Sequence, residues 1–200
     1  MGDSFEVAVD VEATLDDAPR LASTVIEWLT ADGIIDAMPT DDRDVWGPGY
    51  YRPGPQHRLA VAHPDHPYAI AFAQSRLGRL QVVIGRTVFC PIQGEPGPAV
   101  CPLCGYAVVI TDPETGQATE DWERFSDALG DWHGGGPGIV HCPNNGSAIA
   151  INEWQWQGDW PIAVGHLGFE FWNWPFLHPD FVQRISHHLG HRVVATRGKL

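Results

Sequence analysis

Basic residues are scarce in this chain of 200 residues. Lysine occurs once, and lysine and arginine together number 12 against 25 aspartates and glutamates, which gives a formal charge of -13. A surface with this balance repels polyanions, which argues against a general affinity for DNA, RNA or anionic lipid. Nucleic acid and membranes are therefore disfavoured as partners.

Long apolar runs and a recognisable leader are also missing. No apolar stretch reaches the roughly 18 consecutive residues that a membrane-spanning helix needs. The segment from Met1 to Glu6 has neither the basic nor the apolar region of an export signal. We therefore expect a cytoplasmic protein, and the excess of arginine over lysine favours a bacterial source with a GC-rich genome.

Common catalytic motifs are absent as well. The sequence has no His-Glu-x-x-His, no Gly-x-Ser-x-Gly, no phosphate-binding loop and no dinucleotide fingerprint. Two histidine groups, His63 with His66 and His187 with His188 and His191, are better explained as solvated or helix-capping residues than as catalytic metal sites. No motif therefore supports an enzyme.

The periodicity of apolar residues indicates an α+β fold, with a mainly antiparallel sheet and helices on one of its faces. Residues 4–12 alternate strictly between apolar and polar side chains, as a half-buried strand requires. Further strands are expected at 59–62, 68–74, 80–89, 106–111, 148–156, 164–172 and 192–196. Helices are expected between Thr14 and Gly33, between Thr119 and Gly130, and between His178 and Gly190.

The distribution of turn residues and regular elements along the chain indicates one domain with an insertion. Residues 90–146 consist of short turns rich in glycine and proline with one helix, whereas strands and helices of ordinary length lie on either side. We therefore interpret 1–89 and 147–200 as two parts of one α+β domain, and 90–146 as an inserted subdomain.

Four cysteines carry the most specific chemistry. Cys90, Cys101 and Cys142 each begin a Cys-Pro-x-x-Gly segment, and Cys104 is the fourth residue of the second of these. Because cytoplasmic thiols stay reduced, four cysteines near one another in sequence indicate a metal more often than disulfides.

The segment from Cys101 to Gly105, Cys-Pro-Leu-Cys-Gly, resembles the metal-binding knuckle of zinc-ribbon proteins. Such proteins carry two knuckles, and the segment from Cys142 to Gly146 resembles a second one in which Asn145 replaces the second cysteine. The resemblance covers about five residues in each case. It implies a ribbon-like fold for the insertion and a bound zinc ion.

Cys90 is a candidate for the ligand that Asn145 does not supply. The predicted ligands are then Cys90, Cys101, Cys104 and Cys142, which close a tetrahedral site with no position for substrate, so that the zinc is structural. His133 and His141 are alternative ligands. A ribbon that has lost its metal, and a catalytic or redox role for the cysteines, are further alternatives.

Two surfaces are candidates for binding another protein. The first 44 residues contain 12 carboxylates and two arginines, and we select Asp36, Asp41, Asp42 and Asp44 as contacts for a basic partner. The second surface contains Trp172 and Trp174, which lie on one face of the sheet if their strand extends to residue 174. There they either pack against aromatic residues of neighbouring strands or bind a partner protein.

These features lead to three functional hypotheses. The first is a non-enzymatic zinc-binding protein that acts by protein–protein interaction, in its most concrete form an immunity-type inhibitor of a basic toxin. The second is a zinc-dependent enzyme with an open site of cysteine and histidine. The third is a nucleic-acid-associated zinc-ribbon protein that uses its basic end, from Arg184 to Lys199.

Overall fold

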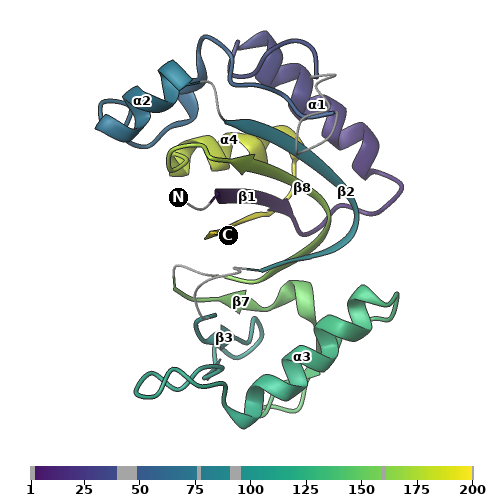
Figure 1. The fold of residues 1–200 in the computed structure, drawn as a ribbon. Coiled ribbons are helices and arrows are strands. Elements are labelled where there is room, and N and C mark those ends of the chain that lie inside the picture. Colours follow the sequence, from purple (N-terminus) through teal and green to yellow (C-terminus); the bar gives the residue numbers. More distant parts are fainter. Residues whose placement is uncertain (1–2, 40–48, 76–77, 91–95, 159–160, 200) are drawn as a thin grey trace.

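The computed structural model describes residues 3–39, 49–75, 78–90, 96–158 and 161–199. They form an upper part with a four-stranded sheet and a lower part around the helix α3 (Figure 1). The sheet has the order β2 (Arg79–Phe89), β8 (Ala163–Trp172), β1 (Ser4–Asp10) and β9 (Val193–Lys199). All neighbouring strands are antiparallel.

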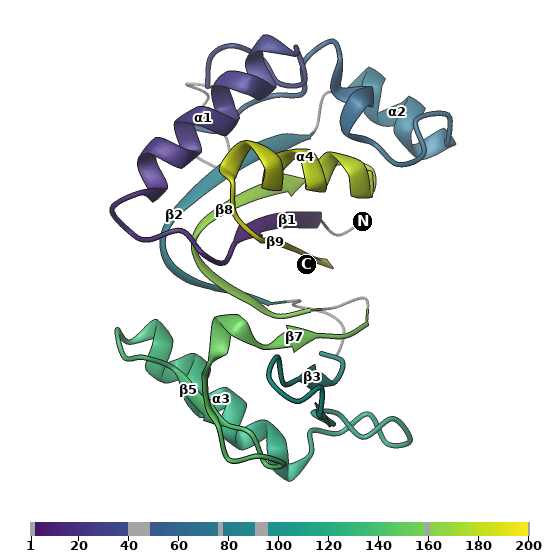
Figure 2. The same cartoon turned by 180° about the vertical axis from the view of Figure 1, so that it is seen from behind.

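Two helices cover one face of this sheet. Figure 2 shows α1 (Ala18–Ala31) and α4 (Pro179–Leu189) on the same side of the strands. Leu29 of α1 and Ile185 of α4 are fully buried, together with Ala8 of β1 and Phe169 of β8, in the first hydrophobic core. The predicted α+β fold with a mainly antiparallel sheet and helices on one face is confirmed.

The larger apolar residues of β1 face away from these helices. Val7 and Val9 are buried on the opposite face of the sheet, in a separate cluster with Phe89. The strands β2 and β8 curve strongly (Figure 1), and the ring of Phe89 lies directly over Gly168. The sheet therefore bends onto its own second face and covers much of it.

The lower part is built from short strands and one long helix. Its elements are β3 (Ala99–Val100), β4 (Ala107–Val108), α3 (Glu120–His133), β5 (Ile139–His141), β6 (Ala148–Ala150), the 3-10 helix η2 (Ile151–Glu153) and β7 (Gln155–Trp156). The strands form a β4-β3-β7 sheet and a β5-β6 hairpin. Phe125 of α3 contacts Trp154 and Trp156 edge to face, at ring-centroid distances of 4.9 and 5.5 Å. This second core draws on residues from Ala99 to Val164, and so extends beyond the 90–146 segment.

The two parts share the ends of β2 and β8. Val164 of β8 belongs to the second core, and β2 has a register irregularity between Ile84 and Thr87. An irregularity of this kind redirects a side chain. Here Arg86 lies 4.5 Å above the ring of Trp132 and donates to the carbonyl of Gly135.

Several predicted strands are wrong. Residues 68–74, expected as a strand, lie in the helix α2 (Pro67–Ser75). Of the expected strand 59–62, the first two residues lie in the 3-10 helix η1 (His57–Ala60), and Val61 forms only an isolated bridge with Leu177. The expected strand 148–156 is interrupted by η2, which turns the chain between β6 and β7. The middle helix does not end at Gly130, because burial of Trp132 in the second core favours another turn. Within the described residues, no helix is long and apolar enough to cross a membrane.

Candidate metal centre

The first knuckle is a tight turn between β3 and β4. The N–H of Cys101 donates to the carbonyl of Tyr106 at 2.9 Å, and the N–H of Gly105 donates back to the carbonyl of Cys101 at 2.9 Å. Gly105 has a φ of 70°, a conformation that glycine adopts without the cost of a side chain. This turn directs the side chains of Cys101 and Cys104 to one side.

The second knuckle connects β5 and β6. The N–H of Cys142 donates to the carbonyl of Ser147 at 2.9 Å, and the N–H of Gly146 donates to the carbonyl of Cys142 at 2.8 Å. Gly146 has a φ of 72°. The second knuckle therefore repeats the backbone hydrogen bonds and the glycine conformation of the first.

Three thiols from the two knuckles come together. The sulfur atoms of Cys101, Cys104 and Cys142 all lie within 4.8 Å of one another, and those of Cys104 and Cys142 are 3.7 Å apart. Two thiolates bound at about 2.3 Å to a tetrahedral zinc ion lie roughly 3.8 Å apart. These three cysteines could hold a metal ion.

The protein environment acts differently on two of the thiols. The backbone N–H of Tyr106, with the amide of Asn144 as a weaker contributor, lowers the pKa of Cys104 to about 7. A substantial fraction of Cys104 is therefore thiolate at neutral pH, the form that binds metals. Burial raises the pKa of Cys101. Deprotonation of Cys101 would therefore depend more on a bound metal ion than that of Cys104.

Cys90 does not join the three thiols, so the structure does not reproduce the predicted set of four cysteines. Cys90 is exposed and directly follows β2, whose last residue, Phe89, pairs with Ala163 of the upper sheet. The chain position of Cys90 is thus determined by the upper sheet, whereas the other three cysteines lie in the knuckles of the lower part. The alternative ligands His133 and His141 are also outside the group.

Sequence reasoning overlooked Asn144. Its side-chain amide donates to Cys104 Sγ at 3.6 Å, across the 40 residues that separate the two knuckles. The only signal in the sequence was its position inside the second Cys-Pro-x-x-Gly segment.

Of the six candidate partner-binding residues, the structure describes Asp36, Trp172 and Trp174. Asp36 is half-buried and its N–H donates to the carbonyl of Arg52, while Asp41, Asp42 and Asp44 lie outside the described residues. Trp172 and Trp174 do not share a face, because Asn173 adopts a φ of 58° and reverses the alternation. Trp172 packs on Phe5, whereas Trp174 is buried in the first core.

An apolar cleft lies beside α2. It has a volume of about 380 Å³ and is lined by Ser4, His63, His66, Tyr68, Ala69, Trp174, Pro175 and Phe176. Tyr68 and Phe176 are largely exposed, at 47% and 60% of their surface. Leu59 and Ile70, at 53% and 47%, add exposed apolar surface in η1 and α2.

Comparison with known proteins identifies no relative: no family model, no curated protein and no solved structure matches this chain.

Proposed function

We propose that this chain is a cytoplasmic zinc-binding protein that acts without catalysis, by binding another protein. The observation that carries the zinc proposal is the separation of 3.7 Å between the sulfur atoms of Cys104 and Cys142, with Cys101 close to both. Thiolates at this spacing suit a small thiophilic ion in tetrahedral coordination.

The proposed role of the zinc ion is structural. Cys104 and Cys142 are 38 residues apart in sequence, and the strands that flank their knuckles have only two or three residues each. A metal that bridges the two knuckles would fix the β5–β6 hairpin against the β3–β4 turn. Binding free energy at such a site becomes folding free energy, because the unfolded chain does not hold the site.

Zinc content measured on protein purified without added metal tests this proposal. We expect one zinc per chain in the wild type and its loss in Cys104→Ser. Cys90→Ser is the matched control, because Cys90 lies outside the group, and it should keep its zinc. Absence of zinc from the wild type would contradict the proposal, and loss of zinc in Cys90→Ser would restore the four-cysteine assignment.

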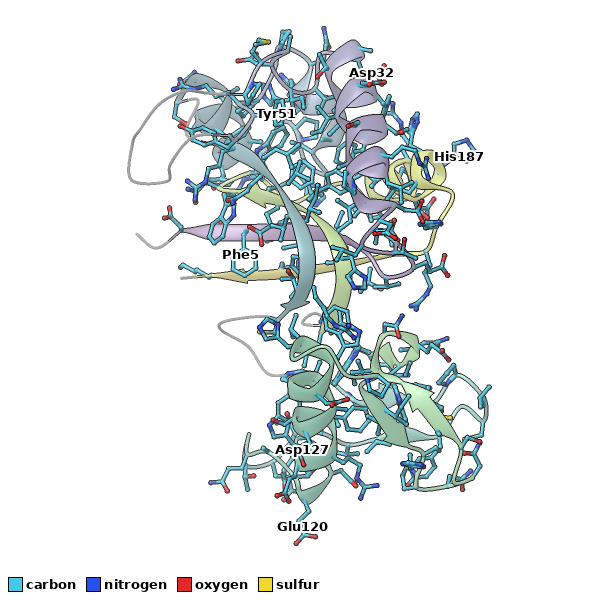
Figure 3. All side chains as sticks on the ribbon, turned by 90° about the vertical axis from the view of Figure 1, so that its right-hand side faces the viewer. Phe5, Asp32, Tyr51, Glu120, Asp127 and His187 are labelled. Atoms are coloured by element: carbon cyan, nitrogen blue, oxygen red, sulfur yellow. The ribbon has the colours of Figure 1, made fainter. Side chains whose placement is uncertain are left out.

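The cleft beside α2 supports the proposal that the chain acts by binding. Exposed aromatic side chains around a concave apolar patch are typical of partner surfaces. The net charge of -13 favours a basic partner. The exposed acidic residues include Glu120 and Asp127, which project outward from α3 (Figure 3). An immunity-type inhibitor of a basic toxin remains the most concrete form of this proposal.

Capture from a bacterial lysate tests the binding role. The immobilised protein should retain a basic protein at low ionic strength and release it in high salt. Phe176→Asp should abolish retention, whereas Leu15→Asp, at a position of similar exposure (54%) outside the cleft, should not. Equal retention by both variants would contradict a role for the cleft.

A zinc-dependent enzyme is the second candidate function. The observation that favours it is the number of thiols, because three protein ligands and an open fourth position are the usual arrangement of catalytic zinc. A hydrolytic or lyase activity that disappears with zinc from a folded protein would support this candidate.

The third hypothesis, a nucleic-acid role for the basic end, gains little support. Arg184 contacts Asp32 at 2.6 Å, and Arg192 donates to the carbonyl of Asn152 at 2.7 Å. Both arginines therefore already bind groups of their own chain.

A further inference from the structure

The two knuckles share two backbone hydrogen bonds and a left-handed glycine at equivalent positions. In each, the N–H of the first cysteine donates to the carbonyl five positions later, and the N–H of the glycine donates back to the carbonyl of that cysteine. The glycines have φ angles of 70° and 72°. Cys104 and Asn145 therefore occupy equivalent positions, three residues after the first cysteine of each knuckle.

The side chains at these two positions also interact with equivalent backbone N–H groups. The backbone N–H of Tyr106, two residues after Cys104, interacts with the Cys104 thiol and lowers its pKa. Asn145 Oδ1 accepts the backbone N–H of Ser147, again two residues further on, at 3.0 Å. In the second knuckle, the Asn145 oxygen thus occupies the place that the Cys104 sulfur occupies in the first knuckle.

We propose that Asn145 Oδ1 is the fourth metal ligand, so that the centre consists of three thiolates and one amide oxygen. This inference rests on the proposed metal binding. A carbonyl oxygen has two lone pairs, and the hydrogen bond from Ser147 uses one of them. The other is available to an ion, and zinc accepts side-chain oxygen from carboxylates, to which the amide carbonyl oxygen is a neutral analogue.

Asn144 does not compete for this position. Its amide nitrogen, a donor that cannot bind a cation, is the atom that lies 3.6 Å from Cys104 Sγ. Asn144 therefore stabilises a thiolate, whereas Asn145 binds the metal. The two neighbouring asparagines supply a matched pair for experiment.

The ligand set determines the charge and strength of the site. Three thiolates and a neutral amide around a divalent ion carry a net charge of -1, where four thiolates carry -2. The amide oxygen is also a weaker ligand for a thiophilic ion than sulfur. We therefore assign to this protein a zinc site of lower affinity than that of a four-cysteine ribbon, in which the Asn145 bond is the first to exchange.

Titration with Co²⁺ alone, followed by absorption spectroscopy, tests the assignment. In the wild type we expect the visible bands of tetrahedral cobalt and sulfur-to-cobalt charge transfer from three thiolates. Asn145→Cys should increase the charge-transfer intensity by about one third, from three thiolates to four, and tighten binding. Asn145→Asp, which keeps an oxygen, should retain tetrahedral bands.

Removal of the oxygen completes the series. Asn145→Ala should weaken Co²⁺ binding about tenfold or more, a loss at least as large as that caused by residues that only hydrogen-bond to ligands. Its visible bands should change, whereas Asn144→Ala should keep those of the wild type. Unchanged bands and affinity in Asn145→Ala, or unchanged charge-transfer intensity in Asn145→Cys, would overturn the assignment while metal binding stands. A wild type that binds no Co²⁺ would overturn metal binding and the assignment together.

Discussion

At the scale of single residues, Asp10 connects three segments of the chain. Its carboxylate is fully buried and accepts the N–H groups of Glu12 and Ala13, at 3.0 and 2.9 Å. Its other oxygen lies 2.9 Å from His191 Nδ1. The end of β1 is thereby attached to the turn that precedes β9.

Asp10→Ala should lower the free energy of unfolding by about 1–3 kcal/mol, because its buried hydrogen-bond donors are left without an acceptor. The two N–H groups and His191 would lose their acceptor. Urea unfolding measures the change. Asp16→Ala, an exposed neighbour, should stay within about 0.5 kcal/mol of the wild type. A loss below about 1 kcal/mol for Asp10→Ala would contradict the prediction.

Glu170 should make the folded state less stable as pH rises. Burial raises the pKa of Glu170, although the Trp172 N–H and the charge of Arg79 act in the opposite direction. A carboxyl with a higher pKa in the folded state binds protons more tightly there. Stability from this group is therefore lost as pH rises from the ordinary value, 4.5, through the folded value.

Glu170→Gln should remove this effect while keeping an acceptor for Trp172, which donates to Glu170 at 2.9 Å. The unfolding free energy of the variant minus that of the wild type should increase as pH rises above 4.5 and then level off. Urea unfolding at a series of pH values measures this difference. A difference that stays constant or falls with pH is the opposite result.

Site residues could be predicted from the sequence only where a local motif positions them. Cys101, Cys104 and Cys142 lie in turns whose glycines and prolines are local signals, and these three come together. Cys90 shares the Cys-Pro-x-x-Gly pattern, but its location depends on the pairing of β2 with β8, between residues far apart in sequence. The burial of Asp10 depends on β9 in the same way.

At the scale of elements, the Phe89 ring of β2 lies so close to Gly168 of β8 that a side chain at position 168 should destabilise the fold. A Cβ atom at this position would lie 2.5 Å from the nearest ring atom of Phe89. Gly168→Ala should therefore cost about 1–3 kcal/mol in urea unfolding, and Phe89→Leu in the same chain should reduce that penalty. Additive effects of the two changes would contradict the contact.

In α3, by contrast, Gly130 has room for a side chain. Nothing lies within 4 Å of a Cβ at Gly130, which is exposed and helical. Gly130→Ala should therefore stabilise the protein by about 0.5–1 kcal/mol, because alanine loses less backbone entropy in a helix. Thermal unfolding should show a higher midpoint, and a lower one would indicate an unrecognised contact.

Elements with clear periodicity were predictable, and short apolar ones were not. The alternation of β1 and the helical spacing in α1 and α4 each identify a single structure. The sequence of α2, Pro-Tyr-Ala-Ile-Ala-Phe-Ala-Gln-Ser, alternates in size but not in polarity, so helix and strand could not be separated by pattern. In the structure only Ala69 and Phe72 of this helix are buried.

At the scale of the whole molecule, loss of the metal should destabilise the lower part much more than the upper part. Removal of zinc by a chelator should increase hydrogen exchange throughout residues 99–156, whose short strands flank the three thiols. The upper sheet has its own core and should stay protected. Mass spectrometry of deuterated peptides measures both. Uniform loss of protection would show that the parts unfold as one unit.

The strand order has a consequence for the synthesis of the chain. β1 lies between β8 and β9, so among the described strands the one synthesised first pairs with the two synthesised last. About 150 residues separate the end of β1 from the start of β8, an interval of roughly 8–30 s at ordinary rates of translation. Throughout that time the apolar side chains of Phe5, Val7 and Val9 have no sheet to enter. We therefore expect the apolar segment of β1 to stay accessible to chaperones until residues 163–199 have been synthesised.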